Sequence, residues 1–498
     1  MTVALSSLRP ATDSRITRGL RRLCSFPVLL SAALTVLAVL TVKGRFDDPD
    51  MWWHLRTGQI IWTTHTIPTT DTFSFTTHHH AYVPHEWLSQ LFIYGAYRMA
   101  GYSGLMLWLC AVTAALLVSA YVLCTLYSGN AKVAFLGAMT VWLFATIGLA
   151  IRPHLIGYLL LLAELLLLHL GSTRSPRWFL ALPPLFALWV NCHGSFLLGL
   201  VLAAALLFSS FFAFRFGLLA APRWEPATRR MLFLALLLSA VALFVNPIGL
   251  RQVLYPIDTL LHQPTGLSLV QEWRPLQLNA ERGIAWLAVL GCLFLITLVR
   301  RTTLYLHELL FLSLGVWLSA SHERMLFAFG ILAAPILTRL LSDTWEDYSP
   351  AQDLPWANAA LLCAATLFVF WIFPTRAGLA AQADQQNPAR ALDFIRSHHL
   401  SGPMLNDYAY GGYLIWAAPD YPVFIDGRAD VFEWTGVFAD YKDWLSLESD
   451  PRVLLDKYRI AFCLLQRQSF MNHVLPLLHD WKLVYSDQSS VVYTRVTR

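Results

Sequence analysis

Two aspartates separated by one residue, Asp48 and Asp50, open the segment of the chain with the strongest chemical potential, and His54 follows four residues later. Paired carboxylates beside an imidazole can bind a divalent cation, bind a sugar hydroxyl or act as a general base. The alternative is a solvated loop beside an aromatic membrane interface, where Trp52 and Trp53 would also fit. We favour the chemical interpretation because similar polar clusters recur at other segment ends.

These further polar clusters stand where long apolar runs begin or end. They are His85-Glu86, Arg152-Pro153-His154, Asn191-Cys192-His193, Glu272-Trp273-Arg274 and His322-Glu323-Arg324. An arginine at the start of an apolar run, as Arg152 and Arg324 are, either grips a phosphate through paired N–H donors or extends to the membrane interface. Glu86 is a third candidate catalytic carboxylate, unless it only favours the start of a helix.

One of these clusters has an ordinary interpretation, and another lies in a loop that bears on function. Asn191 and His193 flank a tight turn, and turn chemistry alone would account for them. Glu272 and Trp273 belong to a long loop that is able to close over a site. If all clusters lie on one face, they form a single site from several chain segments.

The C-terminal part carries two more candidate segments. Asp407 to Gly412, which includes Tyr410, follows a predicted strand, and the run at 423–425 ends in Asp426-Gly427-Arg428. Because sites gather at the carboxyl ends of strands in α/β sheets, Tyr410, Asp426 and Arg428 are candidates for acceptor binding, although structural turns fit equally well. The sequence contains no dinucleotide fingerprint, P-loop or HExxH motif.

The composition indicates what must position these residues. Of the 498 residues, 56% are hydrophobic and 13% charged, whereas soluble proteins carry about 25% charged residues. Apolar runs of about 17–25 residues recur, so we predict a polytopic α-helical membrane protein with about 11 transmembrane helices. The predicted spans are 26–43, 103–126, 131–150, 154–171, 178–191, 195–214, 230–246, 283–300, 303–320, 325–342 and 357–374. The cysteines form no CxxC pair, and we expect no disulfide framework.

The distribution of basic residues predicts the orientation of the spans. Lysine and arginine concentrate in every second connection, which places the N-terminus in the cytoplasm. An odd number of spans then places the polar clusters and the C-terminal region outside. The outer loop 44–102 should contain helices near 51–64 and 86–99, the second lying in the interface. The proline-rich outer loop 247–282 should be mostly irregular. We read the net charge of +5 as a topology signal, and we expect no nucleic-acid partner.

The chain changes character after about residue 376, so we divide it into a membrane domain, 1–375, and an extracytoplasmic α/β domain, 376–498. Helices are predicted at 388–398 and 470–480. Short strands are predicted at 403–405, 423–425, 460–465, 482–486 and 491–494. A domain of this size can hold its own core.

The run Asp50-Met51-Trp52-Trp53-His54-Leu55-Arg56 is similar to the Asp-Pro-Trp-Phe-Asn-Tyr-Arg segment of oligosaccharyltransferase catalytic subunits. In architecture, the chain resembles the GT-C class of integral-membrane glycosyltransferases, which take sugars from polyprenyl-phosphate carriers. It also looks like a group of bacterial membrane proteins with a D-x-D-x-W-W-H-L loop and a GGYL-I-W tail. The resemblance implies that Asp50 is the first-choice catalytic carboxylate, with Asp48 completing a DxD-like pair.

A fainter likeness links 407–412 and 426–428 to the WWDYG region of the same subunits. The tryptophan pair is missing here, so recognition of a peptide sequon does not carry over. The resemblance implies a cytoplasmic, that is inner, bacterial membrane, a polyprenyl-phosphate-linked sugar donor and surrounding membrane lipid. The acceptor is left open as a glycan, a lipid or a protein.

The expected reaction is an inverting displacement, in which Asp50, with Asp48 or Glu86, deprotonates or orients the acceptor. A divalent cation, Mg²⁺ or Mn²⁺, is left open, with Asp48, Asp50 and Glu86 as tentative ligands; without it, arginine must offset the leaving-group charge. The residues expected to contact donor or acceptor are His54, His85, Arg152, His154, Asn191, His193, Glu272, Trp273, Arg324, Tyr410, Asp426 and Arg428.

The sequence leaves two other functions open. A flippase or transporter for a lipid-linked glycan would need ionisable residues deep within spans, and only Glu164 and the pair His307-Glu308 stand out. A non-enzymatic envelope scaffold would tolerate replacement of Asp48 or Asp50. Polar groups that mark span ends favour an enzyme acting at the outer face.

Overall fold

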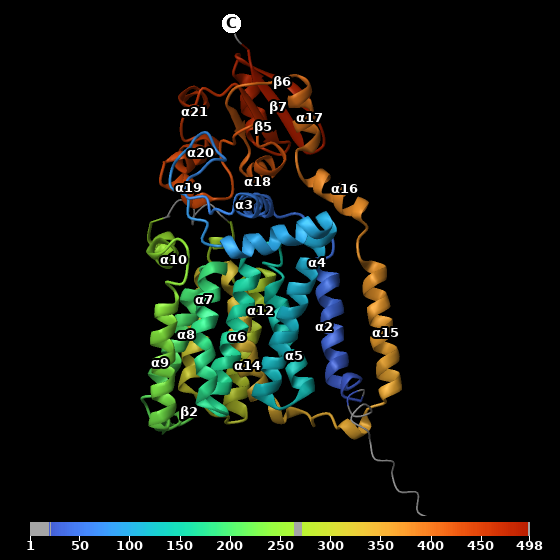
Figure 1. Cartoon of the computed structure of the whole chain (residues 1–498), viewed down its shortest axis with the longest axis vertical. Helices are drawn as coiled ribbons and strands as arrows, with labels where there is room; N and C mark the ends of the chain where they lie inside the picture. Colours follow the sequence, from blue (N-terminus) through green and yellow to red (C-terminus); the bar gives the residue numbers. More distant parts are fainter. Residues whose placement is uncertain (1–18, 20, 263–270, 497–498) are drawn as a thin grey trace, which may run out of the picture.

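The computed structural model describes residue 19 and residues 21–262 and 271–496 of the chain. A bundle of long helices carries a smaller mixed domain at one end (Figure 1). The bundle helices are α2 (Phe26–Val42), the second half of α4 (Trp87–Ser128), α5 (Ala131–Ala145), α6 (His154–Thr173), α7 (Leu182–Cys192), α8 (Phe196–Ser209), α9 (Pro226–Ala242), α12 (Glu281–Val299), α13 (Leu306–Ser321), α14 (Leu326–Leu340) and α15 (Pro355–Ile372). Within the described residues, every predicted span overlaps one of these helices.

The helices of the bundle differ in whether they are long and apolar enough to cross a membrane. Within the described residues, α4, α6, α12 and α15 are long and apolar enough to cross a membrane. The helices α2, α5, α8 and α13 are apolar but shorter, at 10–17 residues. The helical class is therefore as predicted, while the total of about 11 spans stays a prediction.

Helix α4 is two helices joined at a kink. Ala100 (φ −146°, ψ 19°) and Gly101 (φ 60°, ψ −138°) depart from helical geometry, and a positive φ favours glycine because it has no Cβ. The part before the kink lies across the end of the bundle beside α3 (Asp50–Thr64) (Figure 1). Both predicted helices of the 44–102 loop are thus present, and they form a platform under the C-terminal domain.

The loop 247–282 is more ordered than predicted. Within the described residues it contains α10 (Leu250–His262), with Pro256 inside the helix, and a short 3₁₀ turn at Gln271–Trp273. The prediction of a mostly irregular loop was wrong for α10, because Leu250, Leu254 and Ile257 recur at helical spacing. The apolar pattern outweighs the hydrogen bond that proline removes.

The C-terminal domain is built on a four-stranded sheet in the order β4-β5-β7-β6. Its strands are β4 (Met404–Asn406), β5 (Phe462–Gln466), β6 (Trp481–Ser486) and β7 (Ser490–Arg495). Strand β4 pairs parallel with β5, and the other pairs are antiparallel. Its helices are α16 (Arg376–Gln386), α17 (Ala389–Ser397), α18 (Tyr408–Ala417), α19 (Ala429–Glu433), α20 (Val437–Ser446), α21 (Pro451–Lys457) and α22 (Met471–Val474). The predicted α/β character of this segment is confirmed.

Two details of that domain differ from the prediction. The run 423–425 forms one isolated parallel β-bridge, between Val423 and Ser74, in place of a strand. The pairing does not continue, because the Phe424 N–H donates to Asn406 Oδ1 at 2.7 Å. The helix predicted at 470–480 is shorter, with α22 followed by a 3₁₀ turn over Leu475–Leu477. Buried apolar runs in a core need not be strands.

Two glycines allow the C-terminal domain to press against the start of α3. A Cβ on Gly412 would lie 2.1 Å from the Pro49 carbonyl oxygen, and a Cβ on Gly427 would lie 1.8 Å from Asp50 Oδ1. Trp52 of α3 packs edge-on against Tyr413 of α18, with ring centroids 5.2 Å apart. The residues just before and within α3 therefore lie between the bundle and the domain.

Candidate functional site

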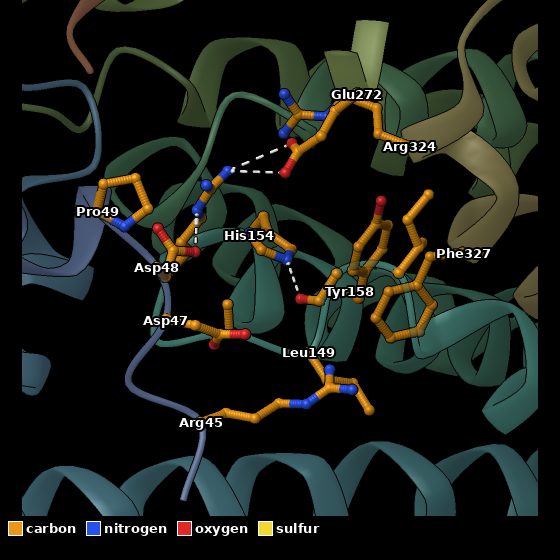
Figure 2. A pocket seen from close by; sticks show the side chains of 14 residues that line it. Arg45, Asp47, Asp48, Pro49, Leu149, His154, Tyr158, Glu272, Arg324 and Phe327 are labelled. Atoms are coloured by element: carbon orange, nitrogen blue, oxygen red, sulfur yellow. Dashed lines mark hydrogen bonds and ion pairs between the residues drawn. The ribbon is translucent and has the colours of Figure 1, made fainter. Parts of the chain in front are cut away.

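Arg152, just before α6, is the centre of an acidic cluster. Its Nε donates to Asp48 Oδ2, its Nη2 lies 3.2 Å from Asp50 Oδ2, and its Nη1 lies 3.3 Å from Glu272 Oε2. Asp48 and Glu272 reach the guanidinium from different sides (Figure 2). Chain segments far apart in sequence thus place three carboxylates around one cation.

Asp50, the first residue of α3, is a buried carboxyl whose pKa is shifted towards neutral pH. Its Oδ1 accepts a hydrogen bond from Trp53 Nε1 at 3.2 Å, and its backbone N–H donates to Asp48 Oδ1 at 2.9 Å. Burial raises the pKa of Asp50 to about 7, although the charge of Arg152 acts in the opposite direction. A carboxylate with a pKa near the working pH is suited to general-base catalysis.

A second cluster consists of Glu86 and three imidazoles. His193 Nε2 lies 3.4 Å and His85 Nε2 3.6 Å from Glu86 Oε1, while His54 Nδ1 lies 3.8 Å from Glu86 Oε2. Gln90 Nε2 lies 3.2 Å from His54 Nδ1. These residues join α3, the start of α4 and the turn between α7 and α8.

The charges in this second cluster are unequal. Burial would raise the pKa of Glu86, but the charge of His85 and a hydrogen bond from it act in the opposite direction and hold that pKa below its usual range. Burial lowers the pKa of His54 to about 3 and that of His193 to about 4. Burial disfavours charge on His85 too, yet the adjacent Glu86 raises the pKa of His85. The arrangement is one carboxylate–imidazole ion pair beside two neutral imidazoles, which can exchange hydrogen bonds with hydroxyl groups.

Asp50 and Arg152 of the first cluster, and Glu86 with its three imidazoles, line one cavity of about 450 Å³. It extends from Asp50 and Arg152 to apolar side chains of α8 and α13, including Val201 and Trp317, which are themselves exposed on the outside of the bundle. A second cavity of about 260 Å³ also borders Arg152 and is lined by Arg45, Asp47, Asp48, His154, Tyr158 and Arg324 (Figure 2). The polar centre is therefore continuous with an apolar opening on the side of the bundle.

Arg324 stands at the boundary between the two cavities. Its guanidinium lies over the ring of Trp273, 4.5 Å from the centroid. Among the described residues, no carboxylate lies within ion-pair distance of Arg324. This cation is thus available to an anionic ligand, whereas Arg152 is already held by carboxylates.

Two predicted site residues are tied to the protein itself. Asn191 Oδ1 accepts from Trp87 Nε1 at 2.8 Å, and its Nδ2 donates to the carbonyls of Ala187 and Val245. His154 borders both cavities, and its Nε2 donates to the Gly148 carbonyl at 2.7 Å. Asn191 therefore holds α4 against α7, and His154 fixes the loop that leads to Arg152.

The three candidates from the C-terminal domain are not grouped with Asp50. Tyr410 lies outside both cavities, and its hydroxyl donates to Ser489 O at 2.9 Å. Arg428 borders the larger cavity, but its Nη2 pairs with Asp426 Oδ2 and its Nη1 with Asp71 Oδ1, each at 2.6 Å. These contacts give Asp426 and Arg428 a structural role, in which they join the C-terminal domain to the loop containing Asp71.

Sequence reasoning missed Asp71 and the backbone of Gly427. Asp71 lies in a run of threonines and serines that carries no catalytic signal, and its partner Arg428 is remote in sequence. Gly427 closes over Asp50 Oδ1. The glycine between the two charged residues Asp426 and Arg428 is the one signal in the sequence that another group approaches this backbone closely.

The three tentative metal ligands are not gathered together. Asp48 and Asp50 hold Arg152, whereas Glu86 is surrounded by imidazoles. Among the described residues, no three side chains of histidine, cysteine, aspartate or glutamate are placed to hold a metal ion. This donor set therefore does not fit a divalent cation.

Comparison with solved structures identifies the fold. The oligosaccharyltransferase of Archaeoglobus fulgidus, tethered to an acceptor peptide containing the NVT sequon, matches 94% of this chain and 74% of its own, with a TM-score of 0.55 and 13% identity. The oligosaccharyltransferase AglB of Archaeoglobus fulgidus, in complex with an inhibitory peptide and a dolichol-phosphate, matches 93% of this chain and 74% of its own, with a TM-score of 0.52 and 13% identity. The resemblance to the GT-C class is thus confirmed for the fold.

A third matching structure, of the Archaeoglobus fulgidus oligosaccharyltransferase, contains Zn and sulfate, with a TM-score of 0.51, 12% identity and coverage of 93% of this chain and 73% of that one. No protein-family model matches the sequence. No curated protein matches it either. At this identity the shared fold carries over to the present chain, and the activity does not follow from it.

Proposed function

We propose that this protein is a membrane glycosyltransferase that moves a sugar from a polyprenyl-phosphate-linked donor to an acceptor. The observation that carries the proposal is the continuous cavity from Asp50 and Arg152 to the apolar side chains of α8 and α13. A lipid-linked sugar has the same two halves, a polar head and a long apolar chain. The GT-C-like fold supports the class of reaction.

The donor enters sideways between α8 and α13, with its lipid chain against Val201 and Trp317. Its phosphate binds at Arg324, whose guanidinium has no carboxylate partner among the described residues, on the side next to Arg152. Guanidinium groups hold phosphate oxygens through paired N–H donors. This placement brings the anomeric carbon towards Asp50.

Asp50 accepts the proton of the acceptor nucleophile as that nucleophile attacks the anomeric carbon. The bond from that carbon to the phosphate oxygen breaks, the oxygen leaves with the electron pair, and the anomeric centre is inverted. Glu86 and its imidazoles orient sugar hydroxyls in the same cavity. Stabilising charge that develops on the leaving group is the largest task in such a step.

The acceptor belongs on the same face as the C-terminal domain. Of the three open classes, glycan, lipid and protein, a peptide is favoured by the solved structures that share the fold, one of which holds an acceptor peptide. The missing tryptophan pair argues against the same sequon. We place the protein in a bacterial cytoplasmic membrane, with its N-terminus in the cytoplasm and residues 376–498 outside.

The test is transfer or hydrolysis of labelled polyprenyl-phosphate and polyprenyl-diphosphate sugars by the purified protein. Wild type should consume a donor, and Asp50→Asn should not. Asp343→Asn, an exposed acid after α14 and at the far end of the bundle, is the matched control and should behave as wild type. Equal consumption by wild type and Asp50→Asn, with both folded, would overturn the assignment.

One observation favours a flippase as the second candidate. Glu164 in α6 is fully buried, and neither of its carboxylate oxygens has a hydrogen-bond partner among the described residues. Buried ionisable groups inside a bundle are typical of transport pathways. Donor movement across vesicles that is lost in Glu164→Gln but retained in Asp50→Asn would favour this alternative.

A further inference from the structure

The acidic cluster around Arg152 has the layout of a cation site in which the cation is a side chain. Asp48 and Asp50 come from one segment, just before and at the start of α3, and Glu272 comes from the turn Gln271–Trp273. Each of the three guanidinium nitrogens faces a different carboxylate, with Nη2 3.2 Å from Asp50 and Nη1 3.3 Å from Glu272. A planar group with fixed donors can satisfy three acids at once, as a metal ion does by coordination.

The oxygens of the two aspartates are already engaged. Asp48 accepts from the Asp50 N–H through Oδ1 and from Arg152 Nε through Oδ2. Asp50 accepts from Trp53 Nε1 through Oδ1 and lies against Arg152 Nη2 through Oδ2. Each of the four oxygens thus has its own donor.

Space around Asp50 is closed as well. A Cβ on Gly427 would lie 1.8 Å from Asp50 Oδ1, so the backbone covers this oxygen on the side of the C-terminal domain. A divalent cation needs several oxygens directed at one point, at roughly 2.0–2.6 Å. The guanidinium fills the place where such a point would lie, and arginine does not give up its charge.

A solved structure with the same fold contains Zn, and the acids of the present site do not fit such an ion. We propose that the guanidinium of Arg152 takes the place of a divalent cation in this chain, and that sugar transfer proceeds without a metal ion. The inference deepens the proposed function, since it concerns the same site. On this inference the positive charge at the site belongs to a side chain of the protein, and no chelator can remove it.

The two arginines then divide the work. Arg152 is a positioning residue, which fixes the two aspartates so that Asp50 can take the nucleophile's proton. Arg324, at the boundary of both cavities, meets the phosphate that leaves with the electron pair. No charge has to be imported before the bond to the phosphate oxygen breaks.

The experiment measures Mn²⁺ binding to the purified full-length protein by electron paramagnetic resonance. Wild type should bind no Mn²⁺ at this cluster. Arg152→Ala removes the internal cation, leaves three carboxylates facing one another, and should gain one Mn²⁺ site. Adding Asp48→Asn to that variant should weaken the new site by about 10- to 100-fold or more. Arg324→Ala is the matched control and should gain no site.

Size-exclusion profile and thermal unfolding establish that each variant is folded, and Arg152→Gln, a polar neutral substitute, replaces Arg152→Ala if the latter is not. A stoichiometric Mn²⁺ site in wild type that is lost in Asp48→Asn would overturn the inference. So would a folded Arg152 variant that gains no site. Wild-type turnover should also be unchanged by EDTA. Absence of any turnover would count against the proposed function alone, because the Mn²⁺ measurements do not depend on a sugar donor.

Discussion

Arg152 and Arg428 are two guanidiniums held by carboxylates, and they differ in what lies around them. The side chain of Arg428 is 1% exposed, between Asp71 and Asp426, with the rings of Phe73 and Tyr82 about its faces. The side chain of Arg152 is 19% exposed and borders two cavities. Both clusters carry more negative than positive charge when ionised.

The difference teaches that an ion pair is not by itself a sign of a site. Arg428 borders the larger cavity, but its side chain and those of its two carboxylates are buried, and its donors are used to join the loop containing Asp71 to the 426–428 turn. The group at Arg152 keeps contact with open space, and it holds Asp50, whose pKa burial raises to about 7. Access to a ligand separates a catalytic cluster from a structural one.

The largest expected effect comes from replacing Asp50, the proposed base held by Arg152. Asp50→Asn removes the proton acceptor while keeping the shape of the side chain, so turnover of a lipid-linked sugar should fall by about 10²- to 10⁴-fold. The thermal midpoint should change little. A variant that keeps more than a tenth of wild-type turnover would show that Asp50 is not the base.

The next largest effect is on stability and comes from replacing Arg428. Arg428→Ala leaves two buried carboxylates without their cation, which should lower the free energy of unfolding by about 3–5 kcal/mol. Arg452→Ala is the control, because its pair with Asp450 is exposed and should contribute only about 0–1 kcal/mol. Thermal unfolding in detergent measures both. Equal midpoints for the two variants would contradict the structural role of Arg428.

Gly427→Ala tests where the two regions meet. The added Cβ would clash with Asp50 Oδ1 and would lie 3.2 Å from Trp53 Nε1, so Asp50 or the 426–428 turn must shift. A misplacement of about 1 Å can cost on the order of 100-fold in rate. Gly291→Ala, where no atom lies within 4 Å of the new Cβ, should leave turnover unchanged. Turnover of Gly427→Ala at the wild-type level would mean that this contact does not position the base.

The smallest expected effect is a pH dependence of stability. Burial alone would raise the pKa of Asp71. The charge of Arg428 and hydrogen bonds from Ser74 and Thr77 outweigh burial and hold that pKa below its usual value of 3.8. Its contribution is therefore fully present above the unfolded-state pKa and is lost as the pH falls through the lower folded-state pKa. Asp71→Asn should flatten the acid limb of a plot of thermal midpoint against pH. An unchanged acid limb would contradict this assignment.

The helices of the bundle, and the position of the polar residues at helix ends, could be predicted because both leave local signals. Apolar runs mark the helices, and Asp48, Asp50 and Arg152 stand at their ends. The ion pairs of Arg152 with Asp48, Asp50 and Glu272 could not be predicted, since the sequence suggested only a phosphate or the membrane interface for Arg152. The pairing of Asp71 with Arg428 was not within reach, since it joins residues remote in sequence whose neighbourhoods are unremarkable. The grouping of Glu86 with imidazoles rather than with Asp48 depends on how α3, α4 and α7 pack. Residue types were predictable, and their partners depended on tertiary contacts.

The contact of Gly427 with Asp50 has a consequence for the order of events during synthesis. Asp50 leaves the ribosome early, whereas the turn that covers it belongs to a domain made near the end. A chain halted before residue 427 lacks the backbone that encloses the base. Under the proposed function, unfinished copies should therefore leave lipid-linked sugars unconsumed, and a stalled translation product would waste no donor.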